Sequence, residues 1–258
     1  MTGIADSISV EGRVVMITGA GQGIGRTYAI EFARAGARVA IVEVNADKGR
    51  AVAVEIAAQG GKAIAVAADV GSPDSVKAAV QQIDQEFGTV EVLINNAAIF
   101  ATLGRQPFDQ ISFDMWERVM RVNVTGSWVC ASAVAAGMRK AQWGRIINIS
   151  SSTVPMGAPM FMHYVTSKAA VIGMTRSMAK ELGPDGITVN CVLPGLTETE
   201  VENPGRSDAM RTKVIEMQCV KRLGVPEDLV GMLLFLASPA SAFTTGQSIA
   251  VDGGTVFL

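Results

Sequence analysis

Tyr164 and Lys168 stand four residues apart, a spacing that could support acid–base chemistry. They fall in residues 163–182, an amphipathic stretch that predicts a helix, so both side chains are expected on one helical face. A free tyrosine has a pKa of about 10 and is a poor base at neutral pH. A nearby ammonium group favours the phenolate and lowers that pKa, although this spacing is common by chance. Three serines, residues 150–152, end the apolar run that precedes the pair.

A glycine-rich turn follows the first apolar run at residues 18–25, Thr-Gly-Ala-Gly-Gln-Gly-Ile-Gly. Its spacing is G-x-x-x-G-x-G, which differs from the G-x-G-x-x-G dinucleotide fingerprint. The physical arrangement is shared, because a strand, a glycine turn and a helix start let backbone N–H groups approach a pyrophosphate. The turn therefore predicts a dinucleotide site, with a purely structural turn as the alternative.

Glu43 ends the second apolar run, where an acidic residue can hydrogen-bond the ribose of adenosine. A 2′-phosphate at this position would bring like charges within about 4 Å, at a cost of about 4 kcal/mol for an effective dielectric constant of about 20. The sequence therefore predicts a preference for NAD over NADP of roughly a thousandfold. Lys48 and Arg26 are close in sequence and could offset this repulsion.

Short β-branched runs alternate with longer Ala-rich amphipathic stretches along the chain. The apolar runs cover residues 14–18, 39–44, 63–70, 90–96, 145–150, 187–192 and 248–254. The helical stretches cover residues 23–35, 46–59, 73–87, 112–140, 163–182 and 226–237. Continuous apolar strands between helices predict a doubly wound α/β fold, in which helices cover both faces of a parallel sheet. We expect one domain over residues 1–258, with a substrate lid at about residues 195–225, an irregular stretch near the expected carboxyl edge of the sheet.

The composition excludes several other classes of protein. Hydrophobic residues make up 49% of the chain and charged residues 18%, which rules out a disordered chain. A formal net charge of −2 leaves no basic surplus for nucleic acid. Three widely spaced cysteines suit buried side chains in a reducing compartment better than disulfides or a metal site. We expect a cytoplasmic protein with no metal and no membrane span, whose low charge favours an oligomer.

Eight short motifs, in order along essentially the whole chain, resemble those of the short-chain dehydrogenase/reductase family. They are TGAGQGIG at 18–25, DV at 69–70, NNAA at 95–98, Asn123 within RVNV, INISS at 147–151, YVTSK at 164–168, PGLTET at 194–199 and VDGG at 251–254. The resemblance implies a Rossmann-type domain that transfers hydride between a nicotinamide dinucleotide and a carbon bearing oxygen. It is specific for fold and reaction type and says little about the substrate.

The resemblance also implies a catalytic set of Asn123, Ser151, Tyr164 and Lys168. Tyr164 would be the general acid/base at the substrate oxygen, and Lys168 would lower its pKa and hold the nicotinamide ribose. Ser151, 13 residues before Tyr164, would hydrogen-bond the same oxygen, and the neighbouring serines fit this spacing less well. Asn123 would position a water molecule that links Lys168 to solvent, or would only stabilise a helix kink.

The cofactor contacts follow from the same resemblance. They are Gly19, Gln22, Gly23, Ile24, Gly25, Glu43, Asp69, Val70, Asn96, Ala97, Ala98, Tyr164, Lys168, Pro194, Gly195, Thr197 and Thr199. The Asp69-Val70 pair could contact adenine or form a plain strand-end turn. Pro194-Gly195 would lie along the nicotinamide, with Thr197 or Thr199 on the carboxamide or pyrophosphate. Ala98 stands where the family usually has glycine, so its methyl group could narrow the cleft.

The substrate contacts are the least defined part of the expected site. They are Ser151, Met156, Phe161 and Tyr164, with Met160 and Met162 close by in sequence. The methionines and Phe161 suit an apolar or aromatic wall, and packing in the core or a subunit interface is an equal alternative. Arg206 and Arg211 in the lid could meet an acidic substrate.

These observations predict an NAD-dependent oxidoreductase of an apolar or aromatic secondary alcohol or ketone. An NADPH-dependent carbonyl reductase of the 3-oxoacyl type is an alternative. A catalytically silent dinucleotide-sensing protein is an alternative of another class, but it has no need of the four catalytic residues. The family commonly forms tetramers through two long helices and the last strand, so we expect a homotetramer with a small-molecule substrate as ligand.

Overall fold

A seven-stranded parallel sheet forms the centre of the computed structural model, which describes residues 7–202 and 207–257. Its strands are β1 (Val14–Thr18), β2 (Arg38–Glu43), β3 (Lys62–Ala67), β4 (Val92–Asn95), β5 (Gly144–Ile149), β6 (Ile187–Pro194) and β7 (Ser248–Val251). They lie in the order β3-β2-β1-β4-β5-β6-β7, so the strand order reverses between β1 and β4. This arrangement confirms the predicted doubly wound fold, in which ligands bind where the order reverses.

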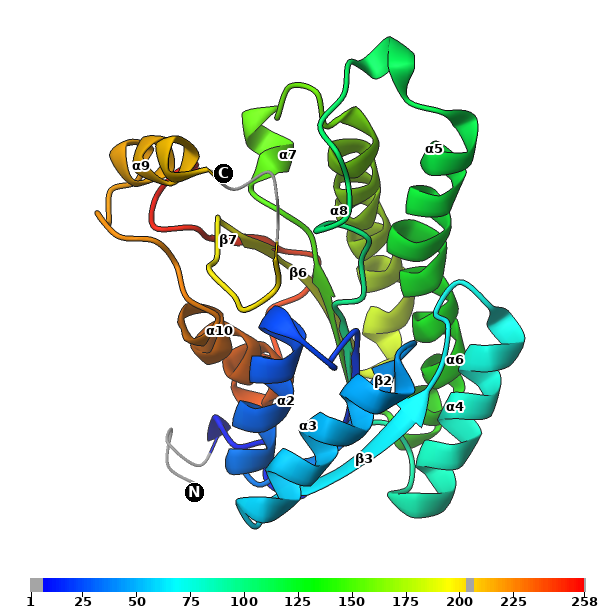
Figure 1. The fold of residues 1–258 in the computed structure, drawn as a ribbon. Coiled ribbons are helices and arrows are strands. Elements are labelled where there is room, and N and C mark those ends of the chain that lie inside the picture. Colours follow the sequence, from blue (N-terminus) through cyan, green and yellow to red (C-terminus); the bar gives the residue numbers. More distant parts are fainter. Residues whose placement is uncertain (1–6, 203–206, 258) are drawn as a thin grey trace.

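Helices cover both faces of the sheet (Figure 1). One layer consists of α2 (Gly23–Arg34), α3 (Ala46–Ala58) and α10 (Glu227–Ala237), and the other of α4 (Pro73–Glu86), α6 (Gly126–Ala141) and α8 (Met162–Leu182). Three further helices are α5 (Phe113–Met120), α7 (Thr153–Met156) and α9 (Asp208–Met217). Short 3-10 turns span Phe108–Gln110, Gly183–Asp185 and Pro239–Ser241. Within the described residues, no helix is long and apolar enough to cross a membrane.

The apolar runs form strands because both of their faces are buried. In β1, Val15 and Ile17 pack into the core beneath α2, α3 and α10, whereas Val14 and Met16 pack into the core on the opposite face. All five residues of this strand are buried, so the run carries no polar alternation. Side-chain caps fix several helix starts, as at α4, where the Ser72 hydroxyl accepts the N–H of Ser75.

The predicted helix over residues 112–140 is interrupted, and this is a correction to the sequence analysis. The structure has α5, then a π-helical turn at Arg121–Thr125, then α6. Asn123 lies in that turn, and its side chain bonds the backbone of Ile99 and the hydroxyl of Ser167. The wider turn therefore carries an inward-facing amide, which is a common use of a π-bulge at a functional site.

The cysteines differ from the expectation at one position. Cys130 and Cys191 are buried, as predicted, but Cys219 is exposed. Its thiol lies on the loop after α9 and donates to the carbonyl oxygen of Gly254. Among the described residues, no group of acidic, histidine and cysteine side chains is arranged to hold a metal ion.

Replacing Tyr28 by phenylalanine should stabilise the fold. Tyr28 is fully buried in α2, and its hydroxyl has no hydrogen-bond partner among the residues that the structure describes. An unsatisfied buried polar group costs about 1–3 kcal/mol, so Tyr28→Phe is expected to raise the free energy of unfolding by about 1 kcal/mol or more. Urea denaturation of both proteins measures this difference, and a less stable variant would show that the hydroxyl is bonded.

Candidate active site

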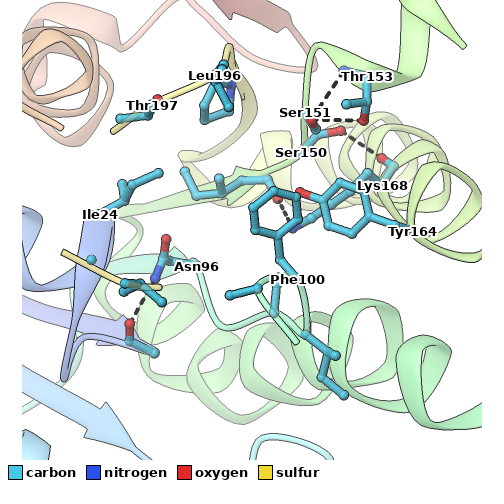
Figure 2. Close-up of a pocket in the computed structure, with 18 of the residues that line it drawn as sticks. Ile24, Asn96, Phe100, Ser150, Ser151, Thr153, Tyr164, Lys168, Leu196 and Thr197 are labelled. Carbon is cyan, nitrogen blue, oxygen red and sulfur yellow. Dashed lines mark hydrogen bonds between the residues drawn. The ribbon is translucent and has the colours of Figure 1, made fainter. Parts of the chain in front are cut away.

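A cavity of about 1130 Å³ opens at the carboxyl ends of the strands. This volume exceeds the roughly 300–1,000 Å³ typical of a pocket for one drug-sized ligand, so it can hold a dinucleotide and a substrate together. Of the residues predicted for the site, all except Asn123 line it. Figure 2 shows Ser151, Tyr164 and Phe100 on one side of this cleft and Ile24 on the other.

The glycine turn between β1 and α2 brings backbone close to backbone. Gly19 has φ +63°, and a Cβ atom there would lie 2.8 Å from Cα of Ala97. A Cβ atom on Gly25 would lie 2.3 Å from the carbonyl oxygen of Gly19, so a side chain at either position would collide with the main chain. Thr18 holds the same junction, because its hydroxyl oxygen accepts the N–H groups of Asn96 and Ala97.

The start of α2 borders the cleft, which Gln22, Gly23 and Ile24 line. Its N-cap residue, Gln22, makes no side-chain capping bond. Backbone N–H groups at a helix start attract anions, and the positive end of the helix dipole adds to this attraction. The turn therefore fits the pyrophosphate of a dinucleotide.

Glu43 lies beside this turn at the end of β2. One carboxylate oxygen accepts the N–H of Gly21 at 3.1 Å, and the other accepts the N–H of Asn45 at 3.1 Å. These two bonds hold the carboxylate at the rim of the cavity, in the place where a ribose is expected. Lys48 is also present there and bonds the side chain of Gln22, whereas Arg26 is paired with Glu55.

The strand ends beyond Glu43 complete this part of the cavity. Asp69 accepts the N–H of Gly71 and forms an ion pair with Arg121 at 3.5 Å, so it shapes a strand-end turn and lines the cleft as well. Ala98 lies on the cavity wall and is not among the residues with positive φ. The backbone at this position therefore accommodates a methyl group without strain.

Tyr164, Ser151 and Lys168 converge on the wall formed by β5 and α8. All three are buried, and the Ser151 side chain lies close enough to the Tyr164 hydroxyl to lower its pKa. The ammonium group of Lys168 donates to the carbonyl oxygen of Ile149 at 2.7 Å and lies 5.8 Å from the centre of the Tyr164 ring. A proton donor, a second hydroxyl and a cation are thus assembled at one point of the cavity.

The ionisation of Tyr164 differs from the expectation. Burial raises the pKa of Tyr164 to about 12, and the hydrogen bond with Ser151 opposes this rise without reversing it. Burial also lowers the pKa of Lys168 to about 8. Burial therefore dominates the pKa of both groups, and Tyr164 keeps its proton at neutral pH.

The three serines at the end of β5 have different surroundings. The Ser150 hydroxyl donates to the backbone oxygen of Lys168 and holds β5 against α8. The backbone N–H of Ser152 donates to the carbonyl oxygen of Pro194 on β6. The Ser151 hydroxyl accepts a hydrogen bond from that of Thr153 and is the serine side chain that acts on the pKa of Tyr164.

Asn123 does not line the cavity. Its amide oxygen accepts the N–H of Ile99 at 2.8 Å, and its amide group donates to Ser167, one residue before Lys168. The alternative prediction was that Asn123 stabilises a helix kink by bonding backbone alone. The bond to the Ser167 side chain shows that it also connects to α8. A second buried chain runs behind the site, in which Asn95 donates to Asn148 and Asn148 donates to Thr175.

The segment after β6 passes over the α2 end of the cavity. Thr197 and Thr199 both line it, and the Thr197 hydroxyl donates to the carbonyl oxygen of Gly195. Glu200 accepts the N–H of Gly23 at 2.8 Å, so its carboxylate occupies the anion-binding start of α2. No sequence signal indicated this contact, because it depends on the path of an irregular loop.

The sequence analysis named two lid arginines, Arg206 and Arg211, that could bind an acidic substrate. Arg211 is already engaged by Glu198 and Asp208, and Arg206 lies outside the described residues. Part of the predicted lid, residues 203–206, lies outside them as well. The rest includes α9, whose Met210, Val214 and Met217 line the cavity.

The proposed substrate wall is largely aromatic. Phe100, Phe161 and Tyr164 form a cluster in which the ring centres lie 4.9–6.0 Å apart. Met156 also lines the cavity, whereas Met160 and Met162 are 50% and 39% exposed and do not. Phe100 was missed by the sequence reasoning, although it follows the NNAA motif that enters the cleft.

A family model described as enoyl-(acyl carrier protein) reductase matches residues 19–256. The 3-oxoacyl-[acyl-carrier-protein] reductase FabG of Vibrio cholerae is 36% identical over 247 residues, which cover 96% of this chain and 98% of that protein. The similarity to known proteins thus covers nearly the whole sequence.

Two solved structures share this fold. A 7α-hydroxysteroid dehydrogenase complexed with NADH and 7-oxo glycochenodeoxycholic acid is 33% identical with a TM-score of 0.93, over 99% of this chain and 98% of that one. A putative NAD(P)-dependent gluconate 5-dehydrogenase from Beutenbergia cavernae with bound NADP is 36% identical with a TM-score of 0.90, over 96% and 98%. The chain therefore belongs to the short-chain dehydrogenase/reductase family, whose members are oxidoreductases that bind a nicotinamide dinucleotide.

Proposed function

We propose that this protein is an NAD-dependent oxidoreductase that interconverts a secondary alcohol and a ketone with an apolar or aromatic body. The observation that carries this proposal is the convergence of Ser151, Tyr164 and Lys168 on one wall of a cavity whose opposite side is the glycine turn. One cleft can therefore hold a dinucleotide next to a protonated tyrosine, and the proposed reaction needs both.

A nicotinamide held in this cleft would supply hydride chemistry at the carbon that bears oxygen. Ser151 donates a hydrogen bond to that oxygen and stabilises the charge that develops on it. Tyr164 gives its Oη proton to the oxygen during ketone reduction and takes a proton from the alcohol during oxidation. The pKa of about 12 suits the acid role, because the proton is present at neutral pH.

Lys168 and Asn123 support Tyr164 from behind. A lysine with a pKa lowered to about 8 can exchange protons near neutral pH, so it can restore or remove the proton that Tyr164 uses. Asn123 positions the helix that carries both residues, through its bond to Ser167. In the cleft, the Lys168 ammonium group is also placed to bond a nicotinamide ribose.

Replacing Tyr164 by phenylalanine should abolish most turnover and preserve cofactor binding. The hydroxyl is the group that transfers the proton, and such transfer contributes about 10²- to 10⁴-fold to a rate. Steady-state assays over a panel of secondary alcohols with NAD, together with NADH binding by fluorescence, measure both effects. Tyr28→Phe is the matched control, since it removes the chain's other phenolic hydroxyl in the core. Normal turnover by Tyr164→Phe would contradict the mechanism.

The proposed preference for NAD rests on Glu43. Its carboxylate lies at the end of β2, where a ribose is expected, and both of its oxygens accept backbone N–H groups, which would oppose rotation away from a 2′-phosphate. The position of Lys48 near Glu43 favours the alternative, an NADPH-dependent carbonyl reductase. The similar protein from Vibrio cholerae is named as a reductase of the 3-oxoacyl type. Lys48 is exposed and bonded to Gln22. Its attraction for a 2′-phosphate should therefore be weaker than the repulsion between that phosphate and the Glu43 carboxylate.

Wild-type protein should be stabilised by NADH far more than by NADPH, and Glu43→Gln should reduce this difference. The substitution removes one negative charge and keeps the shape, so the preference is expected to fall by about a hundredfold or more. Thermal unfolding with each cofactor detects the preference, and fluorescence titration gives its size. Glu55→Gln, which alters a carboxylate outside the cavity, is the control. Stronger stabilisation by NADPH in the wild type would favour the reductase alternative.

The segment from residue 195 to 225 is proposed to act as a lid over the cleft. An isolated bridge joins Thr197 to Gly224, and Arg211 ties α9 to Glu198, so the ends of the segment are connected. At its near end, the Glu200 carboxylate bonds the first turn of α2. A pyrophosphate that binds the same N–H groups must displace this carboxylate.

Glu200→Gln should therefore raise the affinity for NADH by about two- to fivefold, which corresponds to the roughly 0.3–1 kcal/mol that a charge contributes at a helix start. The amide can still accept the N–H of Gly23 but does not repel the pyrophosphate. Fluorescence titration at low ionic strength measures the change, and added salt should diminish it. Glu202→Gln, an exposed carboxylate two positions along, should have no effect. An unchanged or weaker affinity in Glu200→Gln would exclude the competition.

The homotetramer also remains a proposal. Phe113 is 72% exposed and Trp128 is 57% exposed, on α5 and α6, which together cover residues 112–140, the first of the two long helices through which the family commonly associates. Large exposed apolar side chains on one such region support an interface. A cytoplasmic location is likewise a prediction of the composition.

A further inference from the structure

Charge is distributed unevenly along the cavity. Two carboxylates line it, Glu43 and Asp69, and both lie at the ends of β2 and β3, where adenosine is expected. Arg105, by contrast, lies next to the aromatic cluster around Tyr164, and Lys213 lines the cavity from α9. Within the described chain, the wall nearest the reacting position thus has cations and no lining carboxylate.

Arg105 is held in place by contacts with the loop that leads into α8. Its guanidinium lies 5.3 Å from the centre of the Phe161 ring, and its Nη1 donates to the carbonyl oxygen of Pro159 at 3.1 Å. The next residue, Gln106, donates its backbone N–H to Met160 at 3.0 Å. These contacts hold the exposed guanidinium of Arg105 at the rim of the cavity, beside the Phe161 ring.

The hydrogen-bonding capacity of Arg105 is mostly unused. A guanidinium has five N–H donors, and a single bond from this one, to Pro159, is found among residues 7–202 and 207–257. No carboxylate in those ranges forms an ion pair with it, in contrast to Arg211, which Glu198 and Asp208 occupy. An arginine fixed in this way presents its remaining donors as a planar fork, which matches a carboxylate.

We infer that the substrate carries a carboxylate, which Arg105 binds while the apolar body lies against Phe100 and Phe161. This inference rests on the proposed function, because it concerns the other end of the molecule whose oxygen meets Tyr164. The centre of the Phe161 ring lies 5.3 Å from the guanidinium and 4.9 Å from the centre of the Tyr164 ring, so it neighbours both groups. The carboxylate and the reacting carbon should therefore be separated by about the width of one aromatic ring.

A matched pair of ketones tests this inference without knowledge of the natural substrate. We choose 4-acetylbenzoate and its neutral analogue 4-acetylbenzamide, which place one ring between the ketone and the variable group. Protein saturated with NAD cannot reduce a ketone, so isothermal titration calorimetry measures binding alone. Wild-type protein should bind the acid about 10- to 100-fold more tightly than the amide, as expected for hydrogen bonds to a charged group.

Arg105→Gln should lose this preference, and Arg105→Lys should keep part of it, because lysine retains the charge without the planar fork. Arg50→Gln is the control, since it removes one positive charge from an exposed pair on α3, outside the cavity. Loss of binding to both ketones equally would indicate a purely structural role for Arg105 and would overturn the inference. The inference would also be overturned if wild-type protein bound the two ketones equally, or if it bound neither of them.

The experiment also separates this inference from the proposed function. Equal binding of acid and amide, together with loss of turnover in Tyr164→Phe, would reject only the carboxylate. Normal turnover in Tyr164→Phe would reject the catalytic assignment, whatever Arg105 binds.

Discussion

The ammonium group of Lys168 is buried, and the cost of keeping a charge away from water constrains the structure around it. Its only direct bond in the described chain is to the carbonyl oxygen of Ile149, at the last residue of β5. The Ser150 hydroxyl closes the same junction by donating to the backbone of Lys168. These two bonds fix α8 against the end of β5, and this junction sets the position of Tyr164 relative to Ser151.

Behind this junction, polar side chains replace apolar packing between the sheet and its helices. Asn95 and Asn148 stand opposite each other in the register of β4 and β5, and their amides bond directly. Buried amides specify one relative position of neighbouring elements, since any slip would leave them without partners. The π-helical turn serves the same purpose, because it turns Asn123 inward to meet Ile99 and Ser167. A purely apolar interface would tolerate shifts that move Tyr164 relative to Ser151.

The sequence predicts the elements well where burial is simple and less well where it is not. β1 is predicted at residues 14–18 without error, because both of its faces are buried and the apolar run ends at a glycine turn. β3, predicted at 63–70, ends at Ala67, since this edge strand is partly exposed and its last residues form the turn at Asp69 instead. The π-helical turn was missed because it depends on contacts with a distant loop, not on helical periodicity.

The site also contains residues whose positions follow from local patterns and residues whose positions depend on distant contacts. This difference explains why the sequence defines the reaction better than the substrate. Gly19, Lys168 and their neighbours belong to turns and helices whose geometry follows from short-range rules, so their place in the cavity could be predicted. The pKa of Tyr164 could not, because its direction depends on whether burial or a neighbouring charge dominates. Arg105 and Glu200 lie on irregular loops, and only the folded path of each loop brings them to the cavity. The two specificity proposals therefore depend on the segments that sequence patterns describe least.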